Sequence, residues 1–239
     1  MWETTVDGRV LHFYLAGINN QNFIMRDKET GTWWQQVSGK ATHGPLKGQQ
    51  LKRVFHEELS FGIWTREKPG GRVLRPDEKI AAANQYETAD WETKVGKMRV
   101  VEGADVDKRL DPRTLVLGIE VGDKSKAYPL TALQKQSPIM DVVGSTPIML
   151  LLGEDRRSVR AFERTIDGRR LEFFEQIVGA AACVSLVDAE TSSKWNFEGK
   201  ATDGPLAGKQ LKKIFVLEDY WFDWRIYHPD TAVYDLGPR

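Results

Sequence analysis

The sequence predicts a mainly β protein, of the α+β class with few short helices, in which two duplicated β-rich units pack together. Two observations carry this prediction. The chain of 239 residues repeats part of itself, and the repeated parts are rich in strand-forming residues separated by glycine and proline. A hydrophobic content of 41% and a charged content of 28% are typical of a soluble globular protein with one large or two small domains.

The repeat is clearest in two segments of fourteen residues. Residues 39–52 read GKATHGPLKGQQLK and residues 199–212 read GKATDGPLAGKQLK, with eleven identical positions at an offset of 160. The match extends upstream to Asp-Gly-Arg triplets at Asp7 and Asp167. Downstream, the matching residues are Phe55, Trp64 and Pro69 in one segment and Phe215, Trp224 and Pro229 in the other. A period this long indicates a duplicated unit, because solenoid repeats have about 20–50 residues.

Both units are predicted to consist of short strands that follow the Asp-Gly-Arg turn. Gly31 marks a turn between two strands, and the Gly-Pro-Leu-x-Gly segments are typical of tight connections. The strand formers and the period-two alternation predict strands at residues 10–15, 23–26, 32–37 and 51–55 and at residues 171–174 and 211–216.

The part between the repeats is different in character. Residues 66–111 are polar and contain few apolar runs, which predicts a long crossing segment. Residues 115–130 then predict a β-hairpin, and the apolar residues 147–152 predict a central strand. A further short strand is predicted at residues 160–164, and one short helix within residues 218–227, whose aromatic side chains recur at helical spacing and favour packing in the core.

Three parts of the chain follow from these elements. Residues 1–65 form the first unit, residues 66–112 the connecting segment, and residues 113–239 the second unit. The second unit has a front half, residues 115–164, to which nothing in the first unit corresponds. The first unit is therefore expected to match only the C-terminal half of the second.

Composition excludes several classes of protein. The 34 basic and 34 acidic side chains cancel, so no nucleic-acid partner is expected. The longest uncharged apolar stretch, residues 176–187, is too short to span a membrane, and the first residues, MWETTVDGR, carry no signal-peptide pattern. A single cysteine, Cys183, excludes an internal disulfide and a multi-cysteine zinc site, and its apolar surroundings favour a buried side chain.

No metal site and no cofactor are expected in this chain from the motifs, and the catalytic residues stay unknown. The segment that begins at His56 resembles a zinc-protease HExxH motif, but Ser60 stands where the second histidine is needed. The basic pairs at residues 52–53 and 212–213 recur at corresponding places and indicate a solvated strand edge.

The two units differ most in a set of amide, aromatic and imidazole side chains that only the first unit carries. Amides beside tryptophans offer paired donors and acceptors next to a stacking face, which a small polar ligand needs. This pattern predicts a ligand site formed by Asn20, Asn22, Trp34, Gln36 and His43. The alternative is structural: asparagines make turns, tryptophans alternate between core and rim, and the histidine ends a loop.

The motifs resemble those of the bacterial family named domain of unknown function 3179. The resemblance covers nearly the whole chain, but the family name implies no activity. It is carried by LGIEVGDKSKAYPL at residues 117–130, DGRxLxF at residues 7–13 and 167–173, D-x-E-T-G-x-x-W at residues 27–34, both Gly-Pro-Leu-x-Gly turns, and Trp224 with His228-Pro229.

The resemblance also implies features that this chain does not show. Members look like two tandem copies, the first with a cysteine pair just before its Asp-Gly-Arg turn and a histidine upstream. Here that motif would precede residue 1, residues 153–157 of the second unit lack cysteine, and Gln136 stands where the histidine is expected. The chain thus resembles a member that begins in the middle of its first copy. Members often look like envelope or secreted proteins, which leaves the localisation of this chain open.

Three functions remain open at this point, and whether the chain is an enzyme is open with them. The favoured one is a β-rich protein that binds a small polar ligand at its first unit and is non-catalytic or catalytically incomplete. The second is a fragment of a redox- or metal-dependent enzyme whose cysteine and histidine motif lies upstream of residue 1. The third is a structural or assembly module, for which unpaired strand edges would favour a homodimer.

Overall fold

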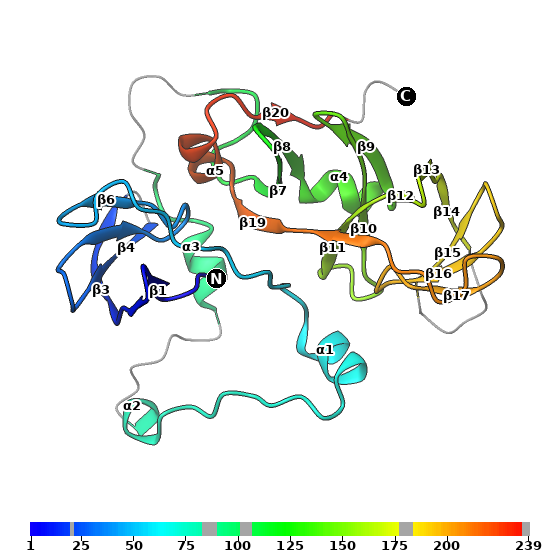
Figure 1. Ribbon diagram of the computed structural model, residues 1–239. Coiled ribbons are helices and arrows are strands. Elements are labelled where there is room, and N and C mark those ends of the chain that lie inside the picture. The colour runs from blue at the N-terminus through cyan, green and yellow to red at the C-terminus, as the bar shows by residue number, and fades with distance from the viewer. Residues whose placement is uncertain (20–21, 83–89, 101–106, 177–183, 236–239) are drawn as a thin grey trace.

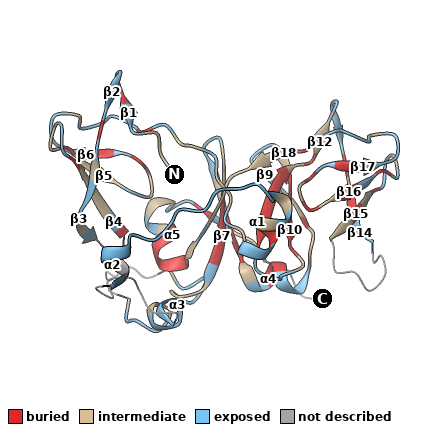
Figure 2. Cartoon of the chain, turned by 90° about the horizontal axis from the view of Figure 1, so that it is seen from below, coloured by how far each residue is buried: buried red, intermediate tan, exposed pale blue. Residues whose placement is uncertain are grey.

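The computed structural model describes residues 1–19, 22–82, 90–100, 107–176 and 184–235. Short strands dominate it and helices are few and short, which confirms the predicted mainly β fold. The described strands form four four-stranded sheets and two two-stranded hairpins. Two of the sheets, β3–β6 and β14–β17, lie at opposite ends of the molecule, and the other two sheets lie between them (Figures 1 and 2).

The N-terminal sheet is an antiparallel meander in the order β3-β4-β5-β6. Its strands are β3 (Phe13–Asn19), β4 (Asn22–Asp27), β5 (Trp33–Gln35) and β6 (Ala41–His43). A hairpin of β1 (Thr5–Val6) and β2 (Arg9–Val10) precedes it. The turn of this hairpin is formed by Asp7 and Gly8, both at positive φ, as tight two-residue hairpin turns require.

The sheet at the other end has the same strand order. Its strands are β14 (Phe173–Glu175), β15 (Ser185–Asp188), β16 (Lys194–Asn196) and β17 (Ala201–Asp203), and the hairpin of β12 (Thr165–Ile166) and β13 (Arg169–Arg170) precedes it. Asp167 and Gly168 form the hairpin turn at positive φ. In both sheets the last two strands shift register between their first and second residue pairs.

One buried aspartate organises each of these sheets. The Asp27 carboxylate accepts hydrogen bonds from the backbone N–H groups of Thr30 (2.6 Å) and Thr32 (3.1 Å) and from the Trp34 indole (2.8 Å). Asp188 accepts the same three bonds, at 2.6, 3.1 and 2.9 Å, from Thr191, Ser193 and Trp195. The aspartate and tryptophan of the D-x-E-T motif therefore hold a turn and the core together.

The two central sheets carry most of the core. One has the order β18-β11-β10-β9 and the other the order β19-β7-β8-β20. Their strands are β7 (Leu115–Val121), β8 (Lys124–Pro129), β9 (Ile139–Val143), β10 (Thr146–Leu152), β11 (Val159–Glu163), β18 (Lys212–Ile214), β19 (Val216–Tyr220) and β20 (Ala232–Val233). Buried residues concentrate in β7, β10 and α5 in the middle of the molecule (Figure 2). Strand β10 lies between two neighbours, as its apolar run predicts.

The described helices are all short. They are α1 (Phe61–Glu67), α2 (Glu78–Ala82), α3 (Trp91–Val95), α4 (Leu130–Lys135) and α5 (Trp221–Tyr227). No described helix has the length and apolar character needed to cross a membrane. Trp221 and Trp224 of α5 are fully buried, as predicted from their spacing.

Two predicted elements differ from the structure. The helix predicted within residues 218–227 begins only at Trp221, because residues 216–220 pair with β7 as strand β19. The strand predicted at residues 51–55 does not form and leaves one isolated bridge between Trp2 and Arg53. The matching stretch in the second unit, residues 211–215, contains β18 and pairs with β11.

Candidate functional site

The structure separates the residues that the sequence predicts for a ligand site. Trp34 is fully buried and faces the core of the N-terminal sheet. Asn22 is buried too, but its side chain contacts α5. Gln36 and His43 are exposed, and within the described ranges no hydrogen bond or ion pair joins them to each other or to Asn22. Asn20 lies outside the described residues, as does Cys183.

The amide of Asn22 donates a hydrogen bond to Asp223 of α5. Asp223 also contacts a second carboxyl group, that of Asp219 near the end of β19, and the two side chains form a hydrogen bond. Burial, and next the charge of Asp223, raise the pKa of Asp219 to about 8, while burial raises the pKa of Asp223 to about 6. At neutral pH the pair therefore holds a proton, which Asp219 donates to Asp223.

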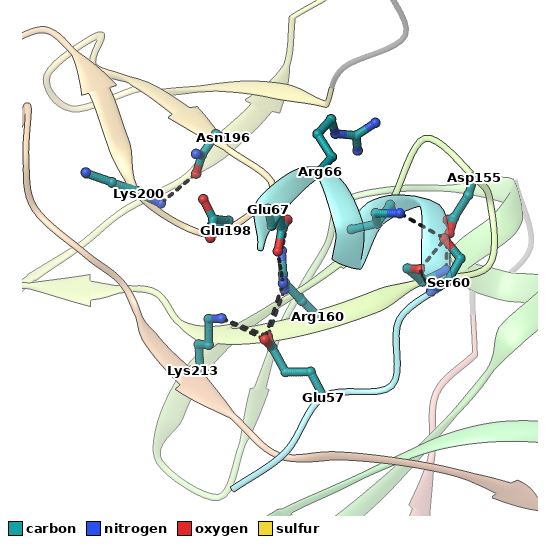
Figure 3. Close-up of polar contacts among 12 residues, drawn as sticks. Glu57, Ser60, Arg66, Glu67, Asp155, Arg160, Asn196, Glu198, Lys200 and Lys213 are labelled. Carbon is teal, nitrogen blue, oxygen red and sulfur yellow. Dashed lines mark hydrogen bonds and ion pairs between the residues drawn. The ribbon is translucent and has the colours of Figure 1, made fainter. Parts of the chain in front are cut away.

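A second polar cluster surrounds Arg160 of β11, whose side chain is 2% exposed (Figure 3). Its Nε donates to Glu57 Oε1 at 2.7 Å. Its two terminal nitrogens donate to the two oxygens of Glu67, each at 2.7 Å, which makes this pair bidentate. Lys213 binds the same Glu57 carboxylate at 2.8 Å, and the guanidinium lies 4.6 Å from the Phe197 ring. The cluster fastens residues 57–67 to the second unit.

The charges of Glu57 and Arg160 stabilise each other. Burial raises the pKa of Glu57, but hydrogen bonds from Arg160 and Lys213 outweigh this effect and leave the pKa below the usual range. Burial lowers the pKa of Arg160, but hydrogen bonds to Glu67 and Glu57 outweigh this effect and raise it. Glu57 and Arg160 are therefore both charged at neutral pH.

Helix α1 is fixed beside Arg160 by its own N-terminus. Ser60 caps the helix, and its backbone N–H donates to Ser158 Oγ at 2.8 Å. Ser158 in turn donates to Asp155 at 2.6 Å (Figure 3). Burial raises the pKa of Asp155, but hydrogen bonds from Ser158 and Ser60 outweigh this effect and lower it to about 2. The buried side chain of Ile63 then anchors α1 in the core of the second unit.

A cavity of about 380 Å³ opens between α1 and Arg160. Its lining residues are Glu57, Leu59, Phe61, Trp64, Glu67, Lys68 and Arg160. The rings of Phe61 and Trp64 stack, with their centroids 5.6 Å apart and their planes 24° apart. One side of the cavity is thus aromatic and the other is charged. This surface is called the α1 cavity below.

The charged side chains that line the α1 cavity balance one another in number. Arg160 and Lys68 are basic, Glu57 and Glu67 are acidic, and Lys213 binds Glu57 from outside the lining. Lys68 is exposed and forms no ion pair with any residue in the described ranges. The cavity therefore has one cation free to bind an anionic group.

A third cluster joins His228, Glu120 and Arg53. His228 Nε2 contacts Glu120 Oε1, its Nδ1 lies 3.0 Å from the Trp224 carbonyl oxygen, and Arg53 binds the other Glu120 oxygen at 3.0 Å. Both ring nitrogens of His228 thus contact oxygen atoms of the fold.

Sequence reasoning missed Arg160, Glu67 and the role of Lys213. The ion-pair partners lie 93–156 residues apart, so no local spacing reveals them. The basic pairs predicted as a solvated edge fit only in part: Lys52 and Lys212 are exposed, whereas Arg53 and Lys213 are half-buried in ion pairs. The period-two alternation could have indicated that one member of each pair faces inwards.

Within the described ranges, no three or more His, Cys, Asp and Glu side chains lie together in a way that could hold a metal ion. That the chain binds no metal or cofactor stays a prediction.

The comparisons with known proteins place the chain but give it no activity. The model of a family described as "Protein of unknown function (DUF3179)" matches residues 1–231. No curated protein matches the chain. No solved structure matches it either.

Proposed function

The chain belongs to the DUF3179 family, whose description states that its function is unknown, and we propose that it is a binding protein that takes a small polar ligand in the α1 cavity. One observation carries the proposal. The cavity, most of whose lining belongs to the first unit, joins a stacked aromatic pair to an unpaired lysine. Ligand sites combine such apolar faces with a few placed polar groups.

The lining indicates the chemistry of the ligand. Glu57 and Glu67 already form ion pairs with Arg160 and Lys213, so they do not favour a cationic ligand. Among the described lining residues, Lys68 is the one whose charge has no ion-pair partner, which favours a carboxylate or another anionic group. The rings of Phe61 and Trp64 favour a flat or apolar part joined to that group. A volume of about 380 Å³ admits a small molecule.

An isothermal titration with 3-phenylpropanoate tests this proposal, because the molecule joins a ring to a carboxylate. We expect saturable binding, weakened about tenfold by Lys68→Ala, since a charge-assisted contact is lost. Phe61→Ala should weaken binding through the aromatic face. Both side chains are exposed, so neither change should unfold the chain.

Lys47→Ala is the matched control, since Lys47 is an exposed lysine on the turn before residue 48, away from the cavity lining. It should bind 3-phenylpropanoate as the unchanged protein does. The neutral analogue 3-phenylpropanamide should bind more weakly and should not respond to Lys68→Ala. An affinity that is the same for all these variants and both compounds would refute the proposal.

A second candidate is the ligand site expected from the sequence, formed by Asn20, Asn22, Trp34, Gln36 and His43. The buried contact of Asn22 with Asp223 supports a polar role for this part of the first unit. A screen of neutral polar compounds by thermal shift tests it: Asn22→Ala, Gln36→Ala and His43→Ala should each reduce a ligand-induced shift. Shifts that survive all three substitutions would exclude this site.

We also infer that the two matched segments are copies of one duplicated unit. The eleven identities in fourteen residues support this inference, as do the corresponding bonds of Asp27 and Asp188. The same strand order in the sheets β3–β6 and β14–β17 supports it as well.

A further inference from the structure

Pairing each residue of the first unit with the residue 160 positions later makes α5 the counterpart of α1. Trp64 corresponds to Trp224 and Lys68 to His228. The residues that end the two helices have nearly the same backbone angles: φ −129° and ψ 65° at Lys68, and φ −131° and ψ 65° at His228. The surroundings of α5 therefore show what a helix of this kind packs against.

The aromatic face of α5 is covered by the hairpin β7–β8. Trp221 and Trp224 are 0% and 1% exposed and form one core cluster with Val116 and Ala127 of the hairpin. Gly118 of β7 lies so close to Trp224 that a Cβ atom on it would be 2.1 Å from the ring. Within the described ranges no such hairpin covers α1: Gly71 lies against Trp64, and Phe61, the counterpart of Trp221, is 65% exposed.

The backbone beside α1 is likewise unpaired. Residues 56–60 are the counterpart of β19, all five residues of which pair with β7. In the described ranges, the backbone groups of Glu57, Glu58 and Leu59 form no hydrogen bond with another backbone group. An unpaired extended segment of this kind is a template for the addition of a strand.

The charges around α1 also match a hairpin. In the second unit, Glu120 of β7 is bound by His228 at the end of α5 and by Arg53 from the first unit. The counterparts of these two basic residues are Lys68 and Lys213. Lys68 lines the α1 cavity and forms no ion pair within the described ranges, and Lys213 binds Glu57 of the lining. A carboxylate from an incoming strand would find the corresponding pair of cations.

We propose that α1 and residues 56–60 form a docking surface for a β-hairpin of the β7–β8 type that belongs to a separate polypeptide. One strand of the hairpin pairs with residues 56–60, a glycine of that strand lies against Trp64, and a glutamate two residues later binds Lys68. The inference rests on the proposed function, because the glutamate and the strand enter the α1 cavity. It names the ligand as an acidic residue on a hairpin.

The probe is a synthetic peptide with the sequence of residues 114–130, titrated into the full chain. We expect saturable binding that competes with 3-phenylpropanoate. Replacing Glu120 by Gln in the peptide should weaken binding about tenfold, and Lys68→Ala in the protein should weaken it by a similar factor. The two changes together should cost no more than either alone, because both remove one contact. A Gly118→Val peptide should not bind, because its side chain would meet Trp64.

Several outcomes separate this inference from the proposed function. If 3-phenylpropanoate binds and the peptide does not, the hairpin is wrong and the small-ligand site stands. If neither binds, both fail. Peptide binding that ignores Lys68→Ala and Phe61→Ala would mean that the peptide displaces the chain's own hairpin from α5, which overturns the docking surface. A concentration-dependent dimer in sedimentation velocity that Phe61→Ala abolishes would assign the surface to a second copy instead.

Discussion

The side-chain amide of Asn22 donates a hydrogen bond to the carboxylate of Asp223, which lies 201 residues further along the chain. Asn22 begins β4 of the N-terminal sheet, and Asp223 lies in the first turn of α5. Both side chains are buried, at 5% and 6% exposure, so this bond replaces water for two polar groups at once. This hydrogen bond connects the first unit directly to the C-terminal helix.

Removing the Asn22 amide should lower the stability of the folded chain. Asn22→Ala takes the amide donor from the buried Asp223 carboxylate and leaves it the hydrogen bond from Asp219, and we expect a loss of about 1–3 kcal/mol in the free energy of unfolding. Urea denaturation followed by tryptophan fluorescence measures it. His43→Ala, a change at an exposed position in the same sheet, should alter stability by less than about 0.5 kcal/mol. Equal effects of the two substitutions on stability would contradict a stabilising role for the hydrogen bond between Asn22 and Asp223.

The coupled pair of Asp219 and Asp223 should make stability depend on pH. The pKa of Asp219 is raised to about 8 in the folded chain, against 3.8 for a free aspartate. Between these values the folded state holds a proton that the unfolded state has lost, so stability falls as pH rises. The contribution of Asp219 is fully present below about pH 4 and is lost by about pH 8, with a slope of at most about 1.4 kcal/mol per pH unit. Asp223, whose pKa is raised to about 6, adds a contribution of the same sign that is lost by about pH 6.

Thermal unfolding measured from pH 5 to pH 8.5 tests this dependence. Groups with lowered pKa values, such as Asp155 and Glu57, lose their contribution only at lower pH, so they do not mask it. Asp219→Asn keeps a neutral donor at this position and should flatten the profile, with its largest gain in stability near pH 8. A profile equally steep in Asp219→Asn would assign the pH dependence to other groups.

Breaking the Arg160 cluster should cost more than breaking an exposed ion pair. Arg160→Met leaves the carboxylates of Glu57 and Glu67 without their shared cation, and we expect the free energy of unfolding to fall by about 3–5 kcal/mol. The side chain of Arg170 is 54% exposed and forms an ion pair with Glu172. Arg170→Met removes this pair and should lower the free energy of unfolding by less than about 1 kcal/mol. Chemical denaturation of both variants gives the comparison. Similar losses would mean that the buried cluster does not hold α1 in place.

The packing of the hairpin on α5 predicts opposite effects for two glycine substitutions. Gly118→Ala brings a methyl group into the Trp224 ring and should destabilise the chain by about 1–3 kcal/mol or more. Gly62→Ala lies in the middle of α1 with open space around it, and should stabilise by about 0.5–1 kcal/mol. Differential scanning calorimetry should show melting temperatures that move in opposite directions. A neutral Gly118→Ala would show that the hairpin does not need a glycine against Trp224.

Local patterns predicted the strands better than they predicted the site. The hairpin at residues 115–130 and the central strand β10 follow from alternation and apolar runs, which depend on near neighbours in the sequence. Helix α1 was missed although Trp64 and Pro69 match Trp224 and Pro229, so the repeat itself held the information. Trp34 was expected at a ligand, but its indole bond to Asp27 places it in the core.

The α1 cavity could not be predicted because its parts come together only through the fold. Arg160 meets Glu57 and Glu67 across about a hundred residues of sequence, and no periodicity connects them. The strand expected at residues 51–55 is reduced to one bridge between Trp2 and Arg53, flanked by backbone hydrogen bonds from Glu3 to Lys52 and from Val54 to Met1. Both features depend on contacts between residues that are far apart in the sequence, which local patterns do not encode.

An NMR titration of the full chain with 3-phenylpropanoate tests ligand binding at the α1 cavity most directly. The side-chain ammonium signal of Lys68 and the indole N–H signal of Trp64 report on the two sides of the cavity. We expect both signals to shift along one saturation curve, while the side-chain amide of Asn22 stays in place. Shifts confined to Asn22 and its neighbours, or no saturable shift at Lys68 and Trp64, would contradict binding at this cavity.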